Sequence, residues 1–135
     1  MSGIIIPVVQ KRTFEYSYLS GTGTQDVVLH PGVDVSAWYY AKILVLVHKI
    51  DAVSGSFAVR LQHSFPTDDD RQEFVISSSD FLAVSSISSA SPNIKASSTG
   101  SDPHAYLKML LTATQGTGGD RLYGEFSVYL VLRGS

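Results

Sequence analysis

Hydrophobic residues recur at every second position along much of this sequence, and this pattern constrains the fold more than any other feature. In the segments 12–20, 56–65 and 121–133, Val, Leu, Phe and Tyr alternate with polar or smaller residues. A period of two is typical of β-strands, in which successive side chains point to opposite faces. No segment shows the 3.6-residue period of an amphipathic helix. We therefore expect an all-β fold.

The strand segments are separated by turns rich in Gly, Ser, Asn and Asp. The turns at 52–56 and 116–120 predict two hairpins, the second of them at the end of the chain. The pattern as a whole predicts seven to nine short strands in two packed antiparallel sheets. We expect a β-sandwich of jelly-roll type, although the order of its strands does not follow from the sequence.

The expected core consists of the alternating side chains of the last two strand segments, which are Leu107, Met109, Leu111, Phe126, Val128, Leu130 and Leu132. The segment 40–51 differs because it is apolar on both faces. Its first face carries Ala41, Ile43, Val45 and Val47, and its second face carries Leu44 and Leu46. A strand of this kind is usually covered on both sides, by a second layer or by another subunit.

The length of 135 residues suits a single β-sandwich domain over 1–135 with one hydrophobic core. Residues 1–11 are predicted to form an N-terminal arm or an edge strand, because Pro7 cannot donate a ladder hydrogen bond. Residues 85–103 are dominated by Ser and other small polar residues and contain two prolines. This composition predicts a long Ser-rich surface loop.

Charge and cysteine content exclude several functional classes. The net charge of −2 and the scattered basic residues argue against nucleic acid as a partner, because phosphate binding needs a clustered basic face. The absence of cysteine excludes disulfides, thiolate zinc sites and a cysteine nucleophile. The apolar segments are too short for a membrane helix, and the start of the chain lacks the pattern of a signal peptide. We therefore expect no membrane partner.

The acidic run Asp68, Asp69 and Asp70 is the segment that most resembles a reactive site. A calcium loop spaces its oxygen ligands and contains a turn glycine, whereas these three acids are consecutive and lack a glycine. Aspartate is also favoured in solvated turns, where its carboxylate accepts backbone hydrogen bonds. The run therefore indicates a solvated hairpin loop first and a weak cation site or surface contact second. Catalysis is less favoured, because no partner motif accompanies the run.

The other polar residues give no catalytic or metal-binding motif. His30, His48, His63 and His104 show none of the spacings of a metal site, and no serine lies in a nucleophile motif. His48 and His63 lie on neighbouring strand segments and are expected to approach each other across a hairpin. We predict no catalytic residue, no metal ligand and no cofactor, so the protein is not expected to be an enzyme.

The apolar N-terminus and several aromatic residues are candidates for a protein interface, because aromatic side chains are enriched in such interfaces. Packing in the core is the alternative for the aromatic residues. Three consecutive aromatic residues at 38–40 must point to different faces, so at least one of them is expected outside the core. The interface candidates are Ile4, Ile5, Ile6, Val8, Tyr16, Tyr18, Trp38 and Tyr39.

A set of strand and turn motifs covers residues 33–76 and 105–133. The motifs are Val33–Ser36, Ser54–Gly55, Gln62–Ser64, Asp68–Asp70, Phe74, Tyr106 and Phe126–Arg133. In these motifs the chain resembles small β-sandwich structural proteins that are encoded among the virion genes of tailed bacteriophages. The sequence departs from that pattern in the acidic turn, which lacks the expected glycine, and in the Ser-rich insertion at 85–103.

The resemblance implies a non-enzymatic component of a virion, such as a capsid decoration or cementing protein, or a minor head or neck protein. The implied partners are the major capsid protein or other head and neck proteins, and the implied state is a homo-oligomer such as a trimer or ring. The implied location is the virion, assembled in the host cytoplasm. The alternative is a carbohydrate- or receptor-binding β-sandwich that uses Trp38, Tyr39 and the loop around Asp69.

Overall fold

A computed structural model describes residues 3–16, 23–66, 73–75, 80–89, 95–96, 100–101, 106–116 and 121–134. The regular elements in these ranges are β-strands, and no helix there is long and apolar enough to cross a membrane. The strands are β1 (Gly3–Tyr16), β2 (Thr24–Asp34), β3 (Tyr40–Asp51), β4 (Ser56–Pro66), β5 (Glu73–Val75), β6 (Leu82–Ile87), β7 (Lys95–Ala96), β8 (Gly100–Ser101), β9 (Tyr106–Thr114) and β10 (Leu122–Arg133).

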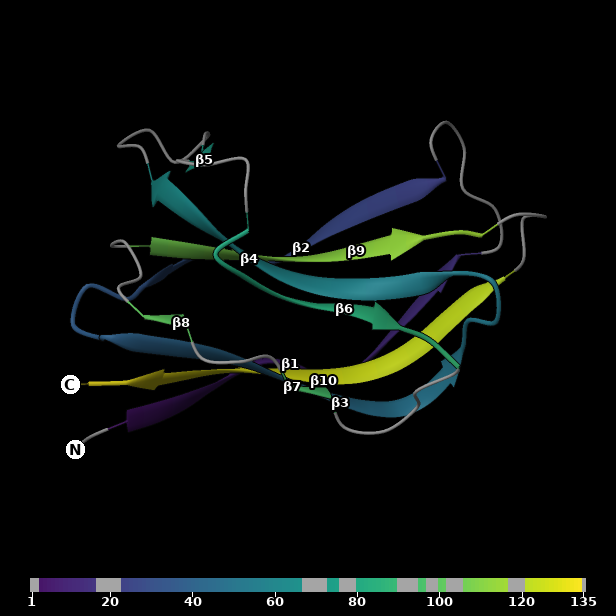
Figure 1. The fold of residues 1–135 in the computed structure, drawn as a ribbon, viewed down its shortest axis with the longest axis horizontal. Helices are drawn as coiled ribbons and strands as arrows, with labels where there is room; N and C mark the ends of the chain where they lie inside the picture. Colours follow the sequence, from purple (N-terminus) through teal and green to yellow (C-terminus); the bar gives the residue numbers. More distant parts are fainter. Residues whose placement is uncertain are drawn as a thin grey trace.

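The strands form two antiparallel sheets that pack face to face, with both chain termini at the same end of the sandwich (Figure 1). Sheet A has the order β1-β10-β3-β7, and β8 also pairs with β3. Sheet B has the order β2-β9-β4-β5, and β6 also pairs with β4. If β5 and β6 share one position and β7 and β8 share another, the order is that of an eight-position jelly roll. The predicted all-β sandwich of jelly-roll type is confirmed.

The two predicted hairpins are wrong. β3 and β10 belong to sheet A whereas β4 and β9 belong to sheet B, so neither β3 with β4 nor β9 with β10 forms a hairpin. Turn residues favour a reversal of the chain, but they do not decide whether the next strand lies beside the previous one or in the opposite layer. As a result His48 and His63 lie in different sheets, and the expected approach of these two residues does not occur.

The core lies between the two sheets and is formed by the alternating apolar side chains of their inner faces. The predicted core residues of β9 and β10 are confirmed, since all of them are fully buried. Phe126 of sheet A contacts Phe57 of sheet B edge to face, with 5.1 Å between ring centroids. Phe14 of β1 stacks on the same Phe126 ring at 6.0 Å. Aromatic contacts of this geometry add to the stabilisation from buried area.

The two segments with uncertain roles in the sequence both contain strands. Residues 3–11 belong to β1, which forms an edge of sheet A, so this part of the predicted arm or edge strand is an edge strand. The long Ser-rich surface loop predicted at 85–103 contains short strands, since β6 extends to Ile87 and both β7 and β8 pair with β3. Small polar residues do not prevent short strands at the edge of a sheet, where only one neighbour is required.

Two connections between the sheets meet at the end of the sandwich opposite the termini (Figure 1). A Cβ atom on Gly116 would lie 1.5 Å from the carbonyl oxygen of Ser54, and one on Gly55 would lie 2.5 Å from the carbonyl oxygen of Thr114. These distances leave no room for a side chain. The motif Ser54–Gly55 therefore has a packing role, which is to let the two connections approach each other closely.

We expect Gly116→Ala to lower the free energy of unfolding by about 3 kcal/mol or more, because the backbone around Ser54 would have to move. Gly23→Ala is the matched control. Gly23 has a φ of +75°, but a Cβ there would meet only the Gln115 carbonyl oxygen, at an ordinary contact distance of 3.6 Å, so its substitution should cost only about 1–2 kcal/mol of backbone strain. Urea denaturation of both variants measures the difference. An equal or smaller loss for Gly116→Ala would contradict the close contact.

The turn after β2 is held by one carboxylate. The Asp34 Oδ1 atom accepts hydrogen bonds from the backbone N–H of Ser36 at 3.0 Å and from the Ser36 hydroxyl at 2.7 Å. The flanking Val33 and Val35 are buried in the core. The backbone hydrogen bond, and after it the hydroxyl hydrogen bond, hold the pKa of Asp34 below its ordinary value, against a smaller opposing effect of burial.

We expect Ser36→Ala to raise the pKa of Asp34 toward its ordinary value, since the substitution removes the hydroxyl donor. Because the folded pKa lies below the unfolded one, the carboxylate stabilises the fold above the unfolded pKa of about 3.9. This contribution is lost as the pH falls through the folded pKa. Titration of the side-chain carboxyl carbon by NMR measures the shift, and Ser85→Ala on exposed β6 is the control. An ordinary pKa in the unaltered protein would refute this account.

Candidate interaction surface

At the end of sheet A that carries both termini, the outward side chains form a surface of apolar and basic residues. Ile5, Val131 and Lys42 lie side by side on β1, β10 and β3, and Arg133 pairs with Tyr40 in a row nearer the end. Ile5 is 64% exposed. Together with Pro7, which is exposed in the next row, these residues are called the terminal patch, defined as Ile5, Pro7, Tyr40, Lys42, Val131 and Arg133.

The alternation that builds the core also places these side chains on the outside. Ala41 and Ile43 on β3, and Leu130 and Leu132 on β10, are fully buried, so the residues between them face outward. The outward positions of a sandwich exposed to water are usually polar. Here Val131 faces outward from β10, and Leu44 and Leu46 on β3 are likewise outward and half-buried. This apolar outer surface is not required by the core.

A shallow depression of about 60 Å³ lies within the terminal patch, lined by Tyr40, Lys42, Val131 and Arg133. Two cationic side chains from neighbouring strands border this depression. Within the described residues, neither side chain forms an ion pair or a hydrogen bond.

The predicted interface residues of the N-terminal segment divide into exposed and partly buried groups. Ile4 and Ile5 are 43% and 64% exposed. Ile6 and Val8 are partly buried and pack against the core. The alternation along β1 thus brings only part of this segment to the surface, and Ile5 is the residue that belongs to the terminal patch.

The predicted aromatic residues are distributed in a similar way. Tyr16 and Trp38 are partly buried against the core, and burial raises the pKa of Tyr16 while the nearby Arg12 opposes that shift. Tyr39 is 41% exposed, and its ring meets the Tyr40 ring edge to face at 4.9 Å. Tyr18, like Asp68, Asp69 and Asp70, lies outside the described residues.

The sequence pattern did not identify five residues of the terminal patch as interface residues, namely Pro7, Tyr40, Lys42, Val131 and Arg133. A signal was present, because the outward positions of two strands with fully apolar inner faces contain aromatic, aliphatic and basic residues rather than small polar ones. The sequence does not show that these positions are adjacent, since that depends on the pairing of β3 with β10.

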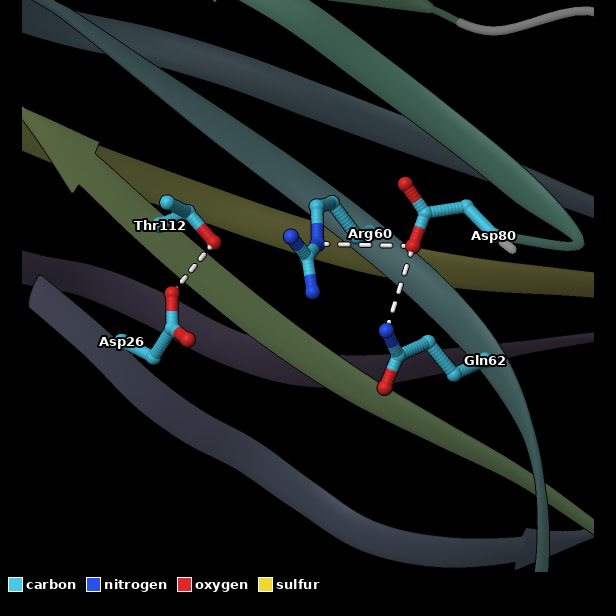
Figure 2. A network of polar contacts seen from close by, with 5 residues as sticks. All are labelled: Asp26, Arg60, Gln62, Asp80 and Thr112. Carbon is cyan, nitrogen blue, oxygen red and sulfur yellow. Dashed lines mark hydrogen bonds and ion pairs between the residues drawn. The ribbon is translucent and has the colours of Figure 1, made fainter. Parts of the chain in front are cut away.

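The outer face of sheet B differs, because several of its polar and charged side chains contact one another (Figure 2). Thr112 on β9 donates a hydrogen bond to Asp26 on β2 at 2.7 Å. Arg60 on β4 lies 3.4 Å from Asp80, and Gln62 donates to the same carboxylate oxygen at 3.3 Å. The Arg60–Asp80 pair is partly exposed, so its contribution to stability is small. The Thr112–Asp26 hydrogen bond joins β9 to β2. The contacts of Arg60 and Gln62 hold Asp80, which precedes β6, against β4.

A buried hydroxyl group holds two irregularities of sheet A. The backbone N–H of Lys11 donates to Ser127 Oγ at 3.0 Å, and His48 Nε2 lies 2.7 Å from the same oxygen. Lys11 has a φ of +48° where β1 bulges against β10, and His48 is the extra residue where β3 bulges against β10. Ser127 is only 3% exposed. The Ser127 hydroxyl therefore stabilises two β-bulges, one through Lys11 and one through His48. In this position it is not presented to a substrate.

The polar clusters of the described residues contain no group of three or more His, Asp or Glu that could hold a metal ion. Three candidate sites remain in this part of the chain. They are the terminal patch, the polar contacts on the outer face of sheet B and the contacts of Ser127 with Lys11 and His48. Of these three, the terminal patch alone combines exposed apolar side chains with cations that have no partner among the residues that the structure describes.

No protein-family model matches the sequence, and no curated protein matches it. Several solved structures of infectious bursal disease virus have a similar fold. The structure of the Gx strain has a TM-score of 0.59 at 10% identity, over 97% of this chain and 31% of the viral chain. The VP2 subviral particle has a TM-score of 0.54 at 14% identity, over 97% and 32%. The T=1 particles have a TM-score of 0.51 at 11% identity, over 98% and 31%.

The chain thus spans about a third of the length of the viral chains that it matches. Nearly all of the chain is included in each match, so the similarity extends over the whole jelly roll and not over one hairpin of it. At these identities the similarity shows only that this chain and the viral chains share a fold.

We expect Ser127→Ala to lower the free energy of unfolding by about 1–3 kcal/mol, because the Lys11 N–H and His48 lose their shared partner. The exposed Ser85→Ala on β6 should stay within about 0.5 kcal/mol of the unaltered protein. Chemical denaturation gives the stabilities, and hydrogen exchange should show faster exchange at the Lys11 amide in Ser127→Ala alone. Unchanged stability and exchange would show that the hydroxyl does not hold the bulges.

Proposed function

We propose that this chain is a non-enzymatic structural protein of a viral particle, which stabilises the particle through contacts between subunits. The observation that carries the proposal is the fold similarity over 97% of the chain to VP2 of infectious bursal disease virus, in a structure of a subviral particle. In finer terms, the sequence motifs favour a capsid decoration or cementing protein, or a minor head or neck protein, of a tailed bacteriophage. The location is then the virion.

The free edges of the sandwich support contacts through side chains rather than through added strands. The edge strand β1 has two register shifts and Pro7, and the edge strand β2 has two register shifts and Pro31. Bulges and prolines on edge strands oppose open-ended pairing with other chains. An association that avoids these edges uses the faces of the sheets, and such contacts can close into rings or fit a lattice.

The terminal patch is the face that we propose for these contacts. An exposed isoleucine beside outward aliphatic and aromatic side chains loses water contact when a partner covers it, and the gain is about 25 cal/mol per Å² of apolar area. A standard interface buries about 800 Å² per partner. Repeated over the many copies of a shell, such contacts stabilise the whole particle. We propose the major capsid protein or other head and neck proteins as partners, together with a homo-oligomer such as a trimer or ring.

The proposal is tested on virions purified from cells that carry the gene. We expect quantitative mass spectrometry to find the chain in the particles at a constant copy number after density-gradient purification. The matched control is an abundant host protein of similar mass, which should be depleted. Treating intact particles with heat should release genome at a lower temperature when the gene is deleted. A chain that stays in the lysate and is missing from every purified particle would overturn the proposal.

The alternative function, carbohydrate binding, predicts different results from the structural role. Trp38, which that role was expected to use, packs partly buried against the core, so Tyr39 is the better exposed of the two rings. Glycan binding that is lost in Tyr39→Ala, by a protein that is absent from virions, would replace the structural role with the binding role.

A further inference from the structure

The terminal patch has a local charge that differs from that of the whole protein. The chain has a net charge of −2, yet the rows from Arg133–Tyr40 to Pro7–Tyr129–Leu44 contain Lys42 and Arg133 and no acidic residue on β1, β3 or β10. The nearest acid before β3 in the sequence, Asp34, already accepts two hydrogen bonds from Ser36. The patch therefore complements a negative charge supplied from outside the described residues.

The depression between the two cations limits the size of the group that it can hold. Its volume is about 60 Å³, whereas pockets for free small ligands have about 300–1,000 Å³. A space of this size takes a single carboxylate rather than a whole free ligand. A guanidinium and an ammonium group on adjacent strands are the donors that bind such an anion with charge-assisted hydrogen bonds. A small anionic group attached to a larger molecule is therefore the favoured occupant.

The surroundings of the depression indicate the nature of the larger molecule. Ile5 and Val131 lie beside it, with Ile5 on β1, which is two strand spacings, or about 10 Å, from β3. Nucleic acid would require a row of cations for successive phosphates, and the described rows supply two. A peptide in extended conformation can present a carboxylate at one position and an apolar side chain two residues away, at about 7 Å.

We propose that the terminal patch binds an extended segment of a partner protein that presents one carboxylate between Lys42 and Arg133 and lays flanking apolar side chains on Val131 and Ile5. The inference rests on the proposed function in one respect only, namely that the partner is another structural protein of a viral particle. The chemistry of recognition, a carboxylate with apolar neighbours, follows from the patch itself.

The test uses two blocked synthetic peptides, Val-Thr-Asp-Thr-Val and Val-Thr-Asn-Thr-Val, which differ only in the carboxylate. We expect NMR titration of the full chain with the aspartate peptide to shift the amide signals of Tyr40, Lys42, Val131 and Arg133. The asparagine peptide should bind about tenfold more weakly, because it cannot form charge-assisted hydrogen bonds. Binding of the aspartate peptide should also weaken as the salt concentration rises.

The variants separate the patch from a general charge effect. The double variant Lys42→Met with Arg133→Met keeps the apolar stems of both side chains and changes the formal net charge from −2 to −4. The matched control, Lys49→Met with Arg121→Met, makes the same change of net charge at the other end of sheet A. We expect the first variant to lose peptide binding at least tenfold and the control to retain it. Thermal unfolding confirms that both variants fold.

Several outcomes would overturn the inference. Equal binding of both peptides, or absence of shifts at the patch, excludes carboxylate recognition. Sodium acetate that binds as tightly as the aspartate peptide shows a free-anion site only, and a DNA oligonucleotide that binds more tightly shows a different partner class. Concentration-dependent association of the chain that is lost with Lys42 and Arg133 shows a second copy as the occupant. None of these results depends on virions, so failure here and failure of the proposed function are distinguishable.

Discussion

Burial of the inner face of β10 is the constraint on which the rest of this structure depends. Every second residue from Leu122 to Leu132 is buried, and Gly124 among them leaves room for the ring of Phe126. That ring contacts Phe57 in the opposite sheet and Phe14 on the neighbouring strand, so it joins both layers and an edge strand. Because the inner face fixes the orientation of the strand, it also fixes which side chains face outward. The apolar and basic character of those outward positions is then free to serve contacts with other molecules.

Irregularities in sheet A are arranged around this central strand. The hydroxyl of Ser127 holds a bulge of β1 through Lys11 and a bulge of β3 through His48. Bulges increase local twist and interrupt pairing at an edge, and Pro7 on β1 has a similar effect on the free side of the strand. The sandwich therefore resists open-ended strand addition while its outer faces stay available. This combination suits a subunit that associates with a fixed number of neighbours, which is the role that we propose for it.

The sequence predicted the strands and the core more successfully than it predicted their arrangement. The alternation in β9 and β10 identified all seven of the core residues that we named there, because burial on one face leaves a direct trace in the residue pattern. The hairpins at 52–56 and 116–120 were wrong, because similar turn residues serve a hairpin and a crossing between layers. Among the candidate interface residues, Ile5 and Tyr39 are exposed, whereas Trp38 and Tyr16 pack against the core.

The sequence by itself determined the class of the fold, the core faces of β9 and β10 and the absence of a thiolate site, since these depend on local periodicity and composition. Tertiary structure alone decided the jelly-roll order and the juxtaposition of Lys42 with Val131 and Arg133. Those residues lie far apart in the chain, and their adjacency depends on the register between β3 and β10. That register is set by the packing of all inner faces at once, and a shift of β3 by one residue would turn Tyr40 and Lys42 toward the core.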